Sequence, residues 1–437
     1  MSAKAQSIAI RQALVCREFA SHALEACRHG TPVDRATAQI LRQRKEQGAR
    51  DRRLIRQVIF AMFRWRGWID QWEHEYLSKA LLLAYLLDGN PWNLVCSVWA
   101  QESNLGILPM EWQTPDDLTA KQQWMSHYTQ DDESLFTSEQ LFPEFFIRSI
   151  NIPQNQATVP FVDQLLSCLQ VRSPLWIRIQ NVDFEKLNQQ LQQHHLTTIP
   201  HPILPNAVEV QGSINVHQLS LFKAGAFEIQ DLASQCIGWV CAPQCEERWW
   251  DVCAGGGGKS LQLAALMKGK GQVIATEIRK TKLYEIRRRA NRGNWSNIIV
   301  HHWDGKEFLG EDTAFDGVLV DAPCSGSGTW RRNPDARWRI NLQDVRKLAG
   351  LQLEILEGAK NKIKPGGLLV YATCSLMQIE NESVVGQFLE QNPNFQLEPF
   401  FHPITNELTE GMMTIWPHML NSDGMFVAKM RYASGII

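Results

Sequence analysis

Two cysteines stand in loops whose composition suits chemistry better than burial. Cys324 lies in a Pro-Cys-Ser-Gly sequence and Cys374 in a Thr-Cys-Ser sequence, and each follows a short apolar run typical of a strand. Burial in a core is the commonest fate of a cysteine, but loops of this kind are poor core sequences. A disulfide is disfavoured in the reducing compartment that the absence of an export signal indicates. We therefore predict two free thiols that share one site.

A pair of thiols has a specific use beside a methyl donor. C5 of cytosine is a poor nucleophile, but a thiolate that adds to C6 turns C5 into an enamine-like carbon that attacks a methylsulfonium. The C5 proton must then leave before the thiol is eliminated, and a second group serves as the base for that step. Asp321 precedes Cys324 by three residues and could hydrogen-bond the ring. Beside a bound methyl donor, these residues would suit methyl transfer to C5 of a cytosine.

A glycine-rich loop is the first half of a predicted cofactor site. It follows a strand-like run and opens a helix, and its residues are Cys253, Ala254, Gly255, Gly256, Gly257, Gly258 and Lys259. Four glycines let the backbone turn tightly beside a ligand, and a helix N-terminus offers free N–H groups to an anionic one. The loop ends in Gly-Lys-Ser, yet a Walker phosphate loop needs a glycine where Cys253 stands. We therefore expect a nucleotide-like cofactor without a triphosphate.

Three acids follow at the ends of successive predicted strands. Glu277 ends the second strand, Asp304 lies just past the third, and Asp321 ends the fourth. The carboxyl ends of parallel strands meet at one edge, where an acid after the second strand accepts ribose hydroxyls. Asp304 could take the exocyclic amine of an adenine. Any one of these acids alone could be a helix cap, but together with the glycine loop they favour an adenosine-containing cofactor.

The segments that must position these residues alternate between strand and helix patterns. Across 229–437, short apolar runs recur at helix-sized spacing, at 249–253, 272–276, 297–300, 317–320, 368–371 and 427–430. Such alternation is typical of an α/β fold with a parallel sheet and helices on both faces. Upstream, strand-like runs at 175–179 and 207–211 flank a helical run at 184–194. They predict a small α+β domain at 143–228.

The first part of the chain has a helical pattern. Apolar residues recur there at three- and four-residue spacing, as at Ile55, Val58 and Ile59. This pattern predicts an all-helical domain at 1–110. Residues 111–142 are acidic and weakly periodic, and we expect a connector there.

The composition is that of an ordinary soluble globular protein. The 437 residues are 44% hydrophobic and 21% charged, and the net charge of -2 gives no global sign of a nucleic-acid partner. Positive charge is concentrated at one end of the chain, because residues 1–66 contain fourteen Lys and Arg and five Asp and Glu, a net charge of +9. The sequence has neither a secretory signal nor an apolar run of membrane length, which predicts a cytoplasmic protein with no membrane partner.

Two basic segments lie close in sequence to the predicted site. The first holds seven cations, at Arg279, Lys280, Lys282, Arg287, Arg288, Arg289 and Arg292. The second, 330–339, mixes Trp330 and Trp338 with arginines. Mixtures of cations and aromatic rings suit phosphate contacts and stacking on unpaired RNA bases. For the first segment, a solvated helix face is an equal alternative.

Four clustered cysteines raise the question of a metal. They are Cys236, Cys241, Cys245 and Cys253, and they lack the paired Cys-x-x-Cys spacing of a zinc site. We therefore expect no metal, and we expect a monomeric chain.

The motifs resemble those of the Sun-type RNA (cytosine-5) methyltransferase family. The resemblance covers about 145–437, and the matching stretches are 251–260, Glu277, Asp304, 321–328, 371–382, 230–235 and 423–426. Residues 1–100 resemble, more weakly, the NusB-type RNA-binding domain of the bacterial small-subunit ribosomal RNA methyltransferase B branch. The resemblance implies a Rossmann-like class I methyltransferase domain at 229–437, S-adenosylmethionine as cofactor, and RNA, above all ribosomal RNA, as partner.

The resemblance also implies a role for each matched residue. The nucleophile of the family falls on Cys374, and its product-release cysteine falls on Cys324. The cofactor contacts fall on the glycine loop and on Glu277, Asp304 and Asp321, the last of which also contacts the base.

Three alternatives stay open at this point. A DNA cytosine-5 methyltransferase would attack with the cysteine after the fourth-strand proline, Cys324, followed by an acid-Asn-Val motif. Here Glu380-Asn381-Glu382 follows a second cysteine instead, which favours RNA. A catalytically idle RNA-binding ribosome assembly factor would need neither the cysteines nor the cofactor residues. Transfer RNA is the alternative to ribosomal RNA as substrate.

Overall fold

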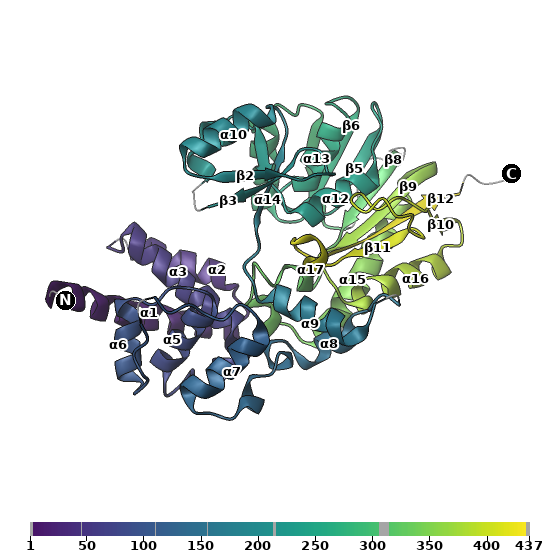
Figure 1. Cartoon of the computed structure of the whole chain (residues 1–437). Helices are drawn as coiled ribbons and strands as arrows, with labels where there is room; N and C mark the ends of the chain where they lie inside the picture. The colour runs from purple at the N-terminus through teal and green to yellow at the C-terminus, as the bar shows by residue number, and fades with distance from the viewer. Residues whose placement is uncertain are drawn as a thin grey trace. The chain divides into compact units, whose positions relative to one another are not determined.

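The computed structural model describes residues 3–44, 46–109, 111–154, 156–212, 216–305 and 314–433. The chain divides into two compact units (Figure 1). The first, here called the helical unit, comprises Met1–Arg172 and Trp330–Asn341. The second, the sheet unit, comprises Ser173–Thr329 and Leu342–Ile437. The finer domain boundaries expected at 110, 142 and 228 stay predictions.

The helical unit is built from nine α-helices and short 3-10 turns among its described residues. The α-helices are α1 (Ala3–Arg28), α2 (Val33–Gln43), α3 (Ala49–Arg64), α4 (Arg66–Ile69), α5 (Leu77–Leu87), α6 (Leu94–Glu102), α7 (Leu118–Thr129), α8 (Glu144–Ser149) and α9 (Thr158–Leu169). The apolar stripe of α3 is buried, as its spacing predicted, and packs against α1 and α5. Because α5 is apolar on every side, it is buried almost throughout and forms the centre of this core.

One segment of the helical unit comes from far along the chain. Residues 330–341 follow the Cys324 loop in sequence, yet they pack among the helices. The ring of Trp330 lies 4.7 Å from that of Phe146, and Arg337 donates to the carbonyls of Leu141, Leu169 and Trp330. Trp330, Arg331 and Arg337 are at most 2% exposed. The expected contact of these three side chains with RNA is therefore wrong, since they hold the segment in place instead.

Replacing Arg337 with alanine is expected to destabilise the helical unit by about 3 kcal/mol, because three buried carbonyls lose their donor. That loss corresponds to a fall of roughly 6–12 °C in the midpoint of its unfolding transition by calorimetry. Arg148→Ala is the control, since Arg148 is paired with Glu144 on an exposed face. Equal midpoints for the two variants would contradict a structural role for Arg337.

The sheet unit begins with a small antiparallel sheet of order β2-β3-β1-β4. Its elements are β1 (Leu175–Ile179), α10 (Phe184–Gln193), β2 (Thr197–Pro200), β3 (Ala207–Gln211), α11 (Ser220–Lys223) and β4 (Phe227–Ile229). The expected strands at 175–179 and 207–211 are confirmed and pair with each other, Ile177 opposite Val208. The helix expected at 184–194 is confirmed as α10.

The larger sheet follows, in the order β10-β12-β9-β8-β5-β6-β7, with β11 paired to β12. Its elements are α12 (Leu232–Cys241), β5 (Arg248–Asp251), α13 (Gly258–Leu266), β6 (Gln272–Glu277), α14 (Lys280–Arg292), β7 (Ile298–His302), β8 (Phe315–Asp321), α15 (Leu342–Lys360), β9 (Ile363–Thr373), α16 (Glu382–Gln391), β10 (Phe395–Leu397), β11 (Met412–Ile415), α17 (Pro417–Leu420) and β12 (Met425–Tyr432). The strands β5 to β9 are parallel, whereas β12 pairs with β9 in the antiparallel sense. The predicted α/β class is confirmed.

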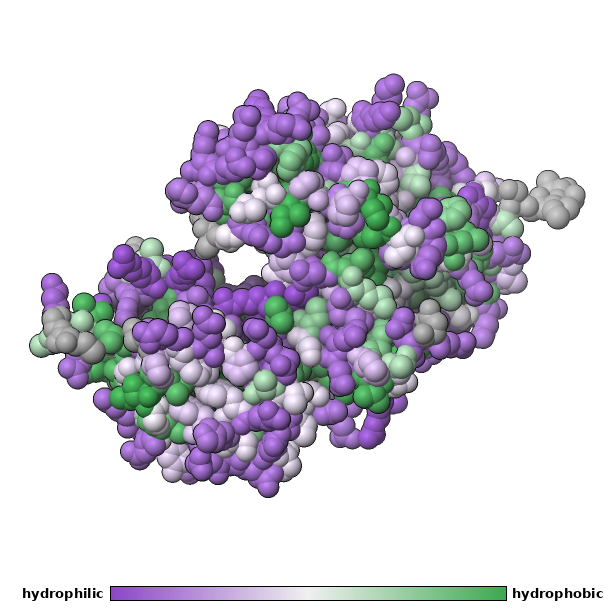
Figure 2. Space-filling view, in the orientation of Figure 1, coloured by the Kyte–Doolittle hydropathy of each residue, from purple (hydrophilic) through white to green (hydrophobic). Residues whose placement is uncertain are grey.

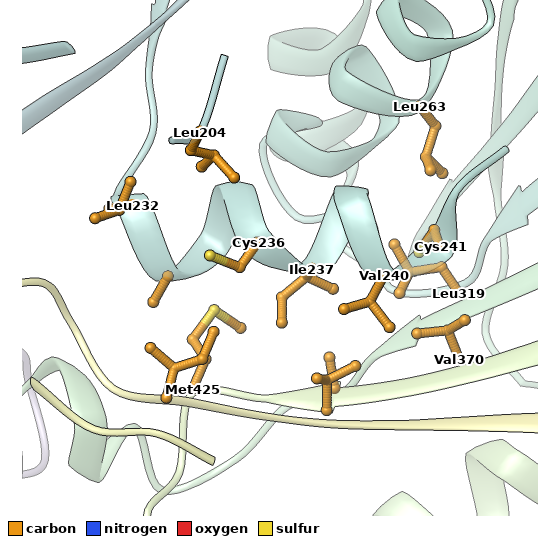
Figure 3. Packing of buried hydrophobic residues seen from close by; sticks show 14 of the residues in the cluster. Leu204, Leu232, Cys236, Ile237, Val240, Cys241, Leu263, Leu319, Val370 and Met425 are labelled. Carbon is orange, nitrogen blue, oxygen red and sulfur yellow. The ribbon is translucent and has the colours of Figure 1, made fainter. Parts of the chain in front are cut away.

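Alternate residues of the central strands face opposite layers of helices. Leu319 and Val370 belong to a cluster with residues of α12 and α13, and Figure 3 shows α12 packed between these sheet residues and Leu204 and Leu263. Their neighbours Val318 and Leu369 belong to a second cluster, with residues of α15 and α16. Burial on both faces leaves the carboxyl ends of the strands as the part of the sheet where polar side chains can gather.

The surface is mostly hydrophilic in the view of Figure 2, with hydrophobic side chains scattered among polar ones. Among the helices of the described residues, none combines the length and the hydropathy that a membrane crossing requires.

Candidate active site

The two cysteines come together at the carboxyl edge of the larger sheet. Asp321 of β8 lies opposite Ala372 of β9, so the loops that follow these parallel strands leave the sheet side by side. The Sγ atoms of Cys324 and Cys374 lie 3.3 Å apart, within hydrogen-bonding distance. The N–H of Gly328 donates to the carbonyl of Cys374 at 2.9 Å, which ties one loop to the other. The structure thus brings together the thiols that the sequence placed at neighbouring strand ends, while their roles stay predictions.

The surroundings of this pair favour a protonated Cys324. The hydrogen bond with Cys374 raises the pKa of Cys324 well above its usual range, and burial raises it further. Cys324 therefore keeps its proton at neutral pH as long as Cys374 is unmodified. A protonated thiol is a poor attacking group, so the reaction needs the two sulfurs to differ in protonation.

A partly buried ion pair connects the glycine loop to the end of β8, three residues before Cys324. Nζ of Lys259 donates to Oδ2 of Asp321 at 2.8 Å. Burial lowers the pKa of Lys259, but the charge and the hydrogen bond of Asp321 outweigh it, so the pKa is raised overall. The charge of Cys374 acts in the same direction, so its sulfur lies within electrostatic reach of the ammonium group. The ion pair thus fixes the ammonium group at the end of β8, beside the loop that carries Cys324.

The glycine loop turns sharply before α13. Gly255 and Gly257 adopt left-handed backbone conformations, with φ of 55° and 82°. A Cβ on Gly257 would lie 3.1 Å from the side chain of Ile286, so both conformation and space favour glycine there. The N–H of Gly257 donates to the carbonyl of Ala254 at 2.8 Å and closes the turn. The loop therefore brings bare backbone to the same edge of the sheet as the cysteines.

A cavity of about 490 Å³ lies at this edge, a size suited to a nucleoside-containing ligand. The predicted site residues that line it are Cys253, Gly255, Glu277, Asp304, Asp321 and Cys324. Leu351 and Ile355 of α15 also line it, although nothing in the sequence pattern distinguished them from core residues. The period of a helix does not distinguish an apolar residue that faces a ligand from one that faces the core.

Glu277 is nine-tenths buried, and Arg279 holds it in place. Nε and Nη2 of Arg279 each donate to one carboxylate oxygen of Glu277 at 2.9 Å. Burial raises the pKa of Glu277, but the hydrogen bonds from Arg279 outweigh it and lower the pKa overall. The carboxylate therefore stays ionised at neutral pH and keeps the acceptor capacity that two ribose hydroxyls need.

Asp251 is a candidate that the sequence reasoning passed over. Its Oδ2 accepts from the hydroxyl of Ser260 at 2.5 Å, whereas its Oδ1 is buried without a partner among the described residues. Burial raises the pKa of Asp251 to about 7. A buried acceptor without a partner is the kind of group that a bound ligand or water satisfies. The available signal was its place at the end of β5, equivalent to those of Glu277 and Asp321.

The basic residues of α14 fall into two sets. Arg289 and Arg292 are directed inward and pair with the buried Glu228, and Lys282 pairs with Glu285. The exposed set consists of Lys280, Arg287 and Arg288, with the 69%-exposed ring of Tyr284 beside them in sequence. The expected RNA contact of the helix therefore applies to the exposed set only, and it stays a prediction.

Comparison with known proteins agrees with this geometry. The family model described as 16S rRNA methyltransferase RsmB/F matches residues 239–431. The probable ribosomal RNA small subunit methyltransferase B of Synechocystis is 31% identical over 315 residues, which are 69% of this chain and 70% of the relative. The ribosomal RNA small subunit methyltransferase B of Yersinia pseudotuberculosis is 32% identical over 271 residues, 61% of this chain and 62% of the relative.

A solved structure extends the likeness to the fold. The crystal structure of a methyltransferase homolog protein from Pyrococcus horikoshii shares 26% identity and a TM-score of 0.52, over 61% of this chain and 89% of that chain. The sheet unit is a Rossmann-like methyltransferase domain, and its cofactor is S-adenosylmethionine. The chain belongs to the 16S rRNA methyltransferase RsmB/F family, a family of Sun-type methyltransferases, as its motifs predicted.

The acidic cavity suits this cofactor, which is a cation and carries a ribose. Glu277→Gln is expected to raise the dissociation constant of S-adenosylmethionine about tenfold, because one charged hydrogen bond is lost. Isothermal titration of the purified protein measures the change. Glu390→Gln on the exposed face of α16 is the matched control and is expected to bind as the unmodified protein does. Equal dissociation constants for the two variants would show that Glu277 does not hold the ribose.

Proposed function

We propose that this protein transfers a methyl group from S-adenosylmethionine to C5 of a cytosine in RNA, with ribosomal RNA of the small subunit as substrate. The observation that carries the proposal is the 3.3 Å contact between the sulfurs of Cys324 and Cys374, on loops beside the cofactor cavity. Methyl transfer to a nitrogen or an oxygen needs no thiol. Transfer to C5 of a pyrimidine needs one group that adds to C6 and another that assists release.

Cys374 is the group that attacks in this proposal. Its thiolate, within electrostatic reach of the Lys259 ammonium, adds to C6 of the cytosine, and the new S–C6 bond makes C5 nucleophilic. S-adenosylmethionine, when bound, supplies the methyl group on a cationic sulfur. Asp321, fixed by its ion pair with Lys259, is placed to orient the ring.

Cys324 serves the second half of the reaction. The C5 proton has to leave before the S–C6 bond breaks, and Cys324 lies beside the attacking sulfur. Once Cys374 is bonded to C6, its hydrogen bond and charge no longer raise the pKa of Cys324. Cys324 then releases its own proton to solvent more readily, and its thiolate accepts the proton from C5. The electrons of the C5–H bond re-form the C5=C6 double bond, and the S–C6 bond breaks with its electron pair returning to Cys374.

Two features support RNA as the substrate. The relatives from Synechocystis and Yersinia pseudotuberculosis are named for ribosomal RNA of the small subunit. The exposed set of α14 joins cations to an aromatic ring, which suits phosphates and unstacked bases. The target base has to leave its stack to reach Cys374, so we expect a cytosine in an accessible loop.

The test is a methylation assay with S-adenosylmethionine labelled in its methyl group. Protein-free small-subunit ribosomal RNA and bulk transfer RNA serve as separate substrates, and bisulfite sequencing locates any 5-methylcytosine. We expect label in the ribosomal RNA at one cytosine. Label in transfer RNA alone would overturn the substrate, and label on another atom would overturn the chemistry. Cofactor binding without transfer to either RNA would favour the idle assembly factor.

A further inference from the structure

Two consecutive buried residues form hydrogen bonds to the loops that carry the two cysteines. Glu380 ends a 3-10 turn and Asn381 directly precedes α16, and the two residues are 0% and 1% exposed. Neither lines the cofactor cavity. Their side chains point to different loops, so one dipeptide contacts the surroundings of both sulfurs.

Glu380 holds the loop of Cys324. Its Oε1 accepts from the N–H of Ser325 at 2.8 Å, and its Oε2 accepts from the Ser325 hydroxyl at 2.5 Å. Ser325 is the residue directly after Cys324. Both carboxylate oxygens are thus used on the neighbour of this cysteine, which fixes the backbone that carries its sulfur.

Asn381 holds the loop of Cys374 in the same manner. Its Oδ1 accepts from the Thr373 hydroxyl at 2.6 Å, and its Nδ2 donates to the carbonyl of Ser375 at 3.0 Å. These are the residues immediately before and after Cys374. The amide therefore spans the cysteine from both sides.

Gln352 and Tyr371 fix the carboxylate of Glu380 in turn. Nε2 of Gln352 donates to Oε1 of Glu380 at 3.1 Å and to the carbonyl of Pro323 at 2.9 Å. The Tyr371 hydroxyl lies 3.0 Å from Oε1 of Gln352. Glu380 is thereby held by Ser325 of the Cys324 loop and by Gln352 of α15, and the Tyr371 hydroxyl of β9 donates to its backbone carbonyl at 2.5 Å.

A buried carboxylate is an unfavourable choice if stability alone is at stake. Desolvation of a carboxylate is costly, and its hydrogen bonds only offset that cost, whereas apolar residues of similar volume are often as stabilising. Reacting groups, by contrast, need placement within about 0.5 Å, and a misplacement of about 1 Å can cost on the order of 10²-fold in rate. The network is therefore better explained by placement of the sulfurs than by stability.

We propose that Glu380 and Asn381 are positioning residues that hold the two sulfurs in contact, Glu380 for Cys324 and Asn381 for Cys374. The inference rests on the proposed function and deepens it, because it assigns the two halves of the reaction to two separate supports. Loosening Glu380 impairs release of the product, whereas loosening Asn381 impairs the initial attack. A support that served only stability would affect both halves alike.

Three substitutions at the pair test this division of labour. Glu380→Asp keeps the charge but draws the carboxylate back by one methylene, and we expect release about 10²-fold slower. Glu380→Gln keeps the length and an acceptor for the Ser325 N–H, and we expect turnover within a few-fold of the unmodified protein. Asn381→Asp keeps Oδ1 but removes the donor to Ser375, and we expect attack about 10²-fold slower.

The readout is the covalent protein–RNA species on a denaturing gel, followed over time with single-turnover methyl transfer. Glu380→Asp should accumulate this species, and Asn381→Asp should form it slowly without accumulation. Asn392→Ala is the matched control, since Asn392 is a buried amide at the other end of α16 that bonds Glu357 and Phe388. Ser325→Ala removes one hydrogen bond of Glu380 and leaves Glu380 and Asn381 themselves unchanged. It should accumulate less of the covalent protein–RNA species than Glu380→Asp does.

We expect Asn392→Ala to affect attack and release to the same extent. If the Glu380 and Asn381 variants also slowed attack and release equally, the positioning role would be overturned. Loss of turnover in Glu380→Gln as large as in Glu380→Asp would also overturn it, because charge rather than placement would then be what matters. Failure of the proposed function would look different. In that case neither the unmodified protein nor Cys324→Ala would form a covalent species at all.

Discussion

Cys374→Ala is expected to reduce methyl transfer to RNA by roughly 10⁴-fold or more. Without the catalytic nucleophile the covalent adduct cannot form, and C5 of cytosine alone is too poor a nucleophile to attack the methyl donor. The substitution removes one sulfur at the sheet edge and leaves the cofactor cavity lined as before, since Cys374 is not among its lining residues. The affinity for S-adenosylmethionine is therefore expected to stay unchanged, so that chemistry alone is lost.

The assay for this variant is single-turnover transfer of a labelled methyl group to ribosomal RNA. Cys245→Ala is the matched control, because Cys245 is exposed and is not among the residues that line the cavity. More than a tenth of normal transfer in Cys374→Ala, with full activity in the control, would mean that another group attacks. Cys324 is the group that a DNA-type cytosine-5 methyltransferase would use.

Cys324→Ala is expected to give the opposite phenotype, in which attack proceeds and release fails. Without the group beside C5 that accepts its proton, the S–C6 bond persists after methyl transfer. Loss of a general base typically slows a step by about 10²–10⁴-fold, which is enough for the adduct to accumulate. A denaturing gel should then show a protein band of reduced mobility that disappears after nuclease treatment.

The double variant Cys324→Ala/Cys374→Ala controls for adventitious crosslinks and should show no such band. A band in Cys374→Ala but not in Cys324→Ala would exchange the two roles. That outcome would contradict the assignment of attack to Cys374 and of product release to Cys324.

Residues at strand ends could be predicted from the sequence, because position along a parallel sheet follows from the order of elements. Glu277, Asp321, Cys324 and Cys374 each follow a short apolar run, and the carboxyl ends of such strands meet at one edge. The strand pattern thus sufficed to place Glu277, Asp321 and Cys324 on one cavity, with Cys374 beside Cys324, without any knowledge of distances. The same rule would have found Asp251, had every acid that ends a strand been counted.

Residues that act through tertiary contacts could not be predicted in this way. Arg289 and Arg337 have the same charge and sequence surroundings as RNA-binding arginines, yet each is committed to a buried partner far away in the chain. The contact of Glu380 could not be predicted either, because nothing in its neighbouring sequence indicates that its carboxylate contacts Ser325, fifty-five residues earlier. Whether a charged side chain is buried depends on packing between distant segments, and neither the hydrophobic period nor the composition of the sequence predicts that packing.

The most direct test of the covalent mechanism is to identify the amino acid and the nucleotide that are joined in the trapped protein–RNA species. Cys324→Ala is allowed to react with ribosomal RNA, the complex is digested with nuclease and protease, and the linked peptide is analysed by tandem mass spectrometry. We predict a single methylated cytidine joined to the sulfur of Cys374. Linkage to any other residue, or to a nucleotide other than cytidine, would contradict the mechanism proposed for this protein.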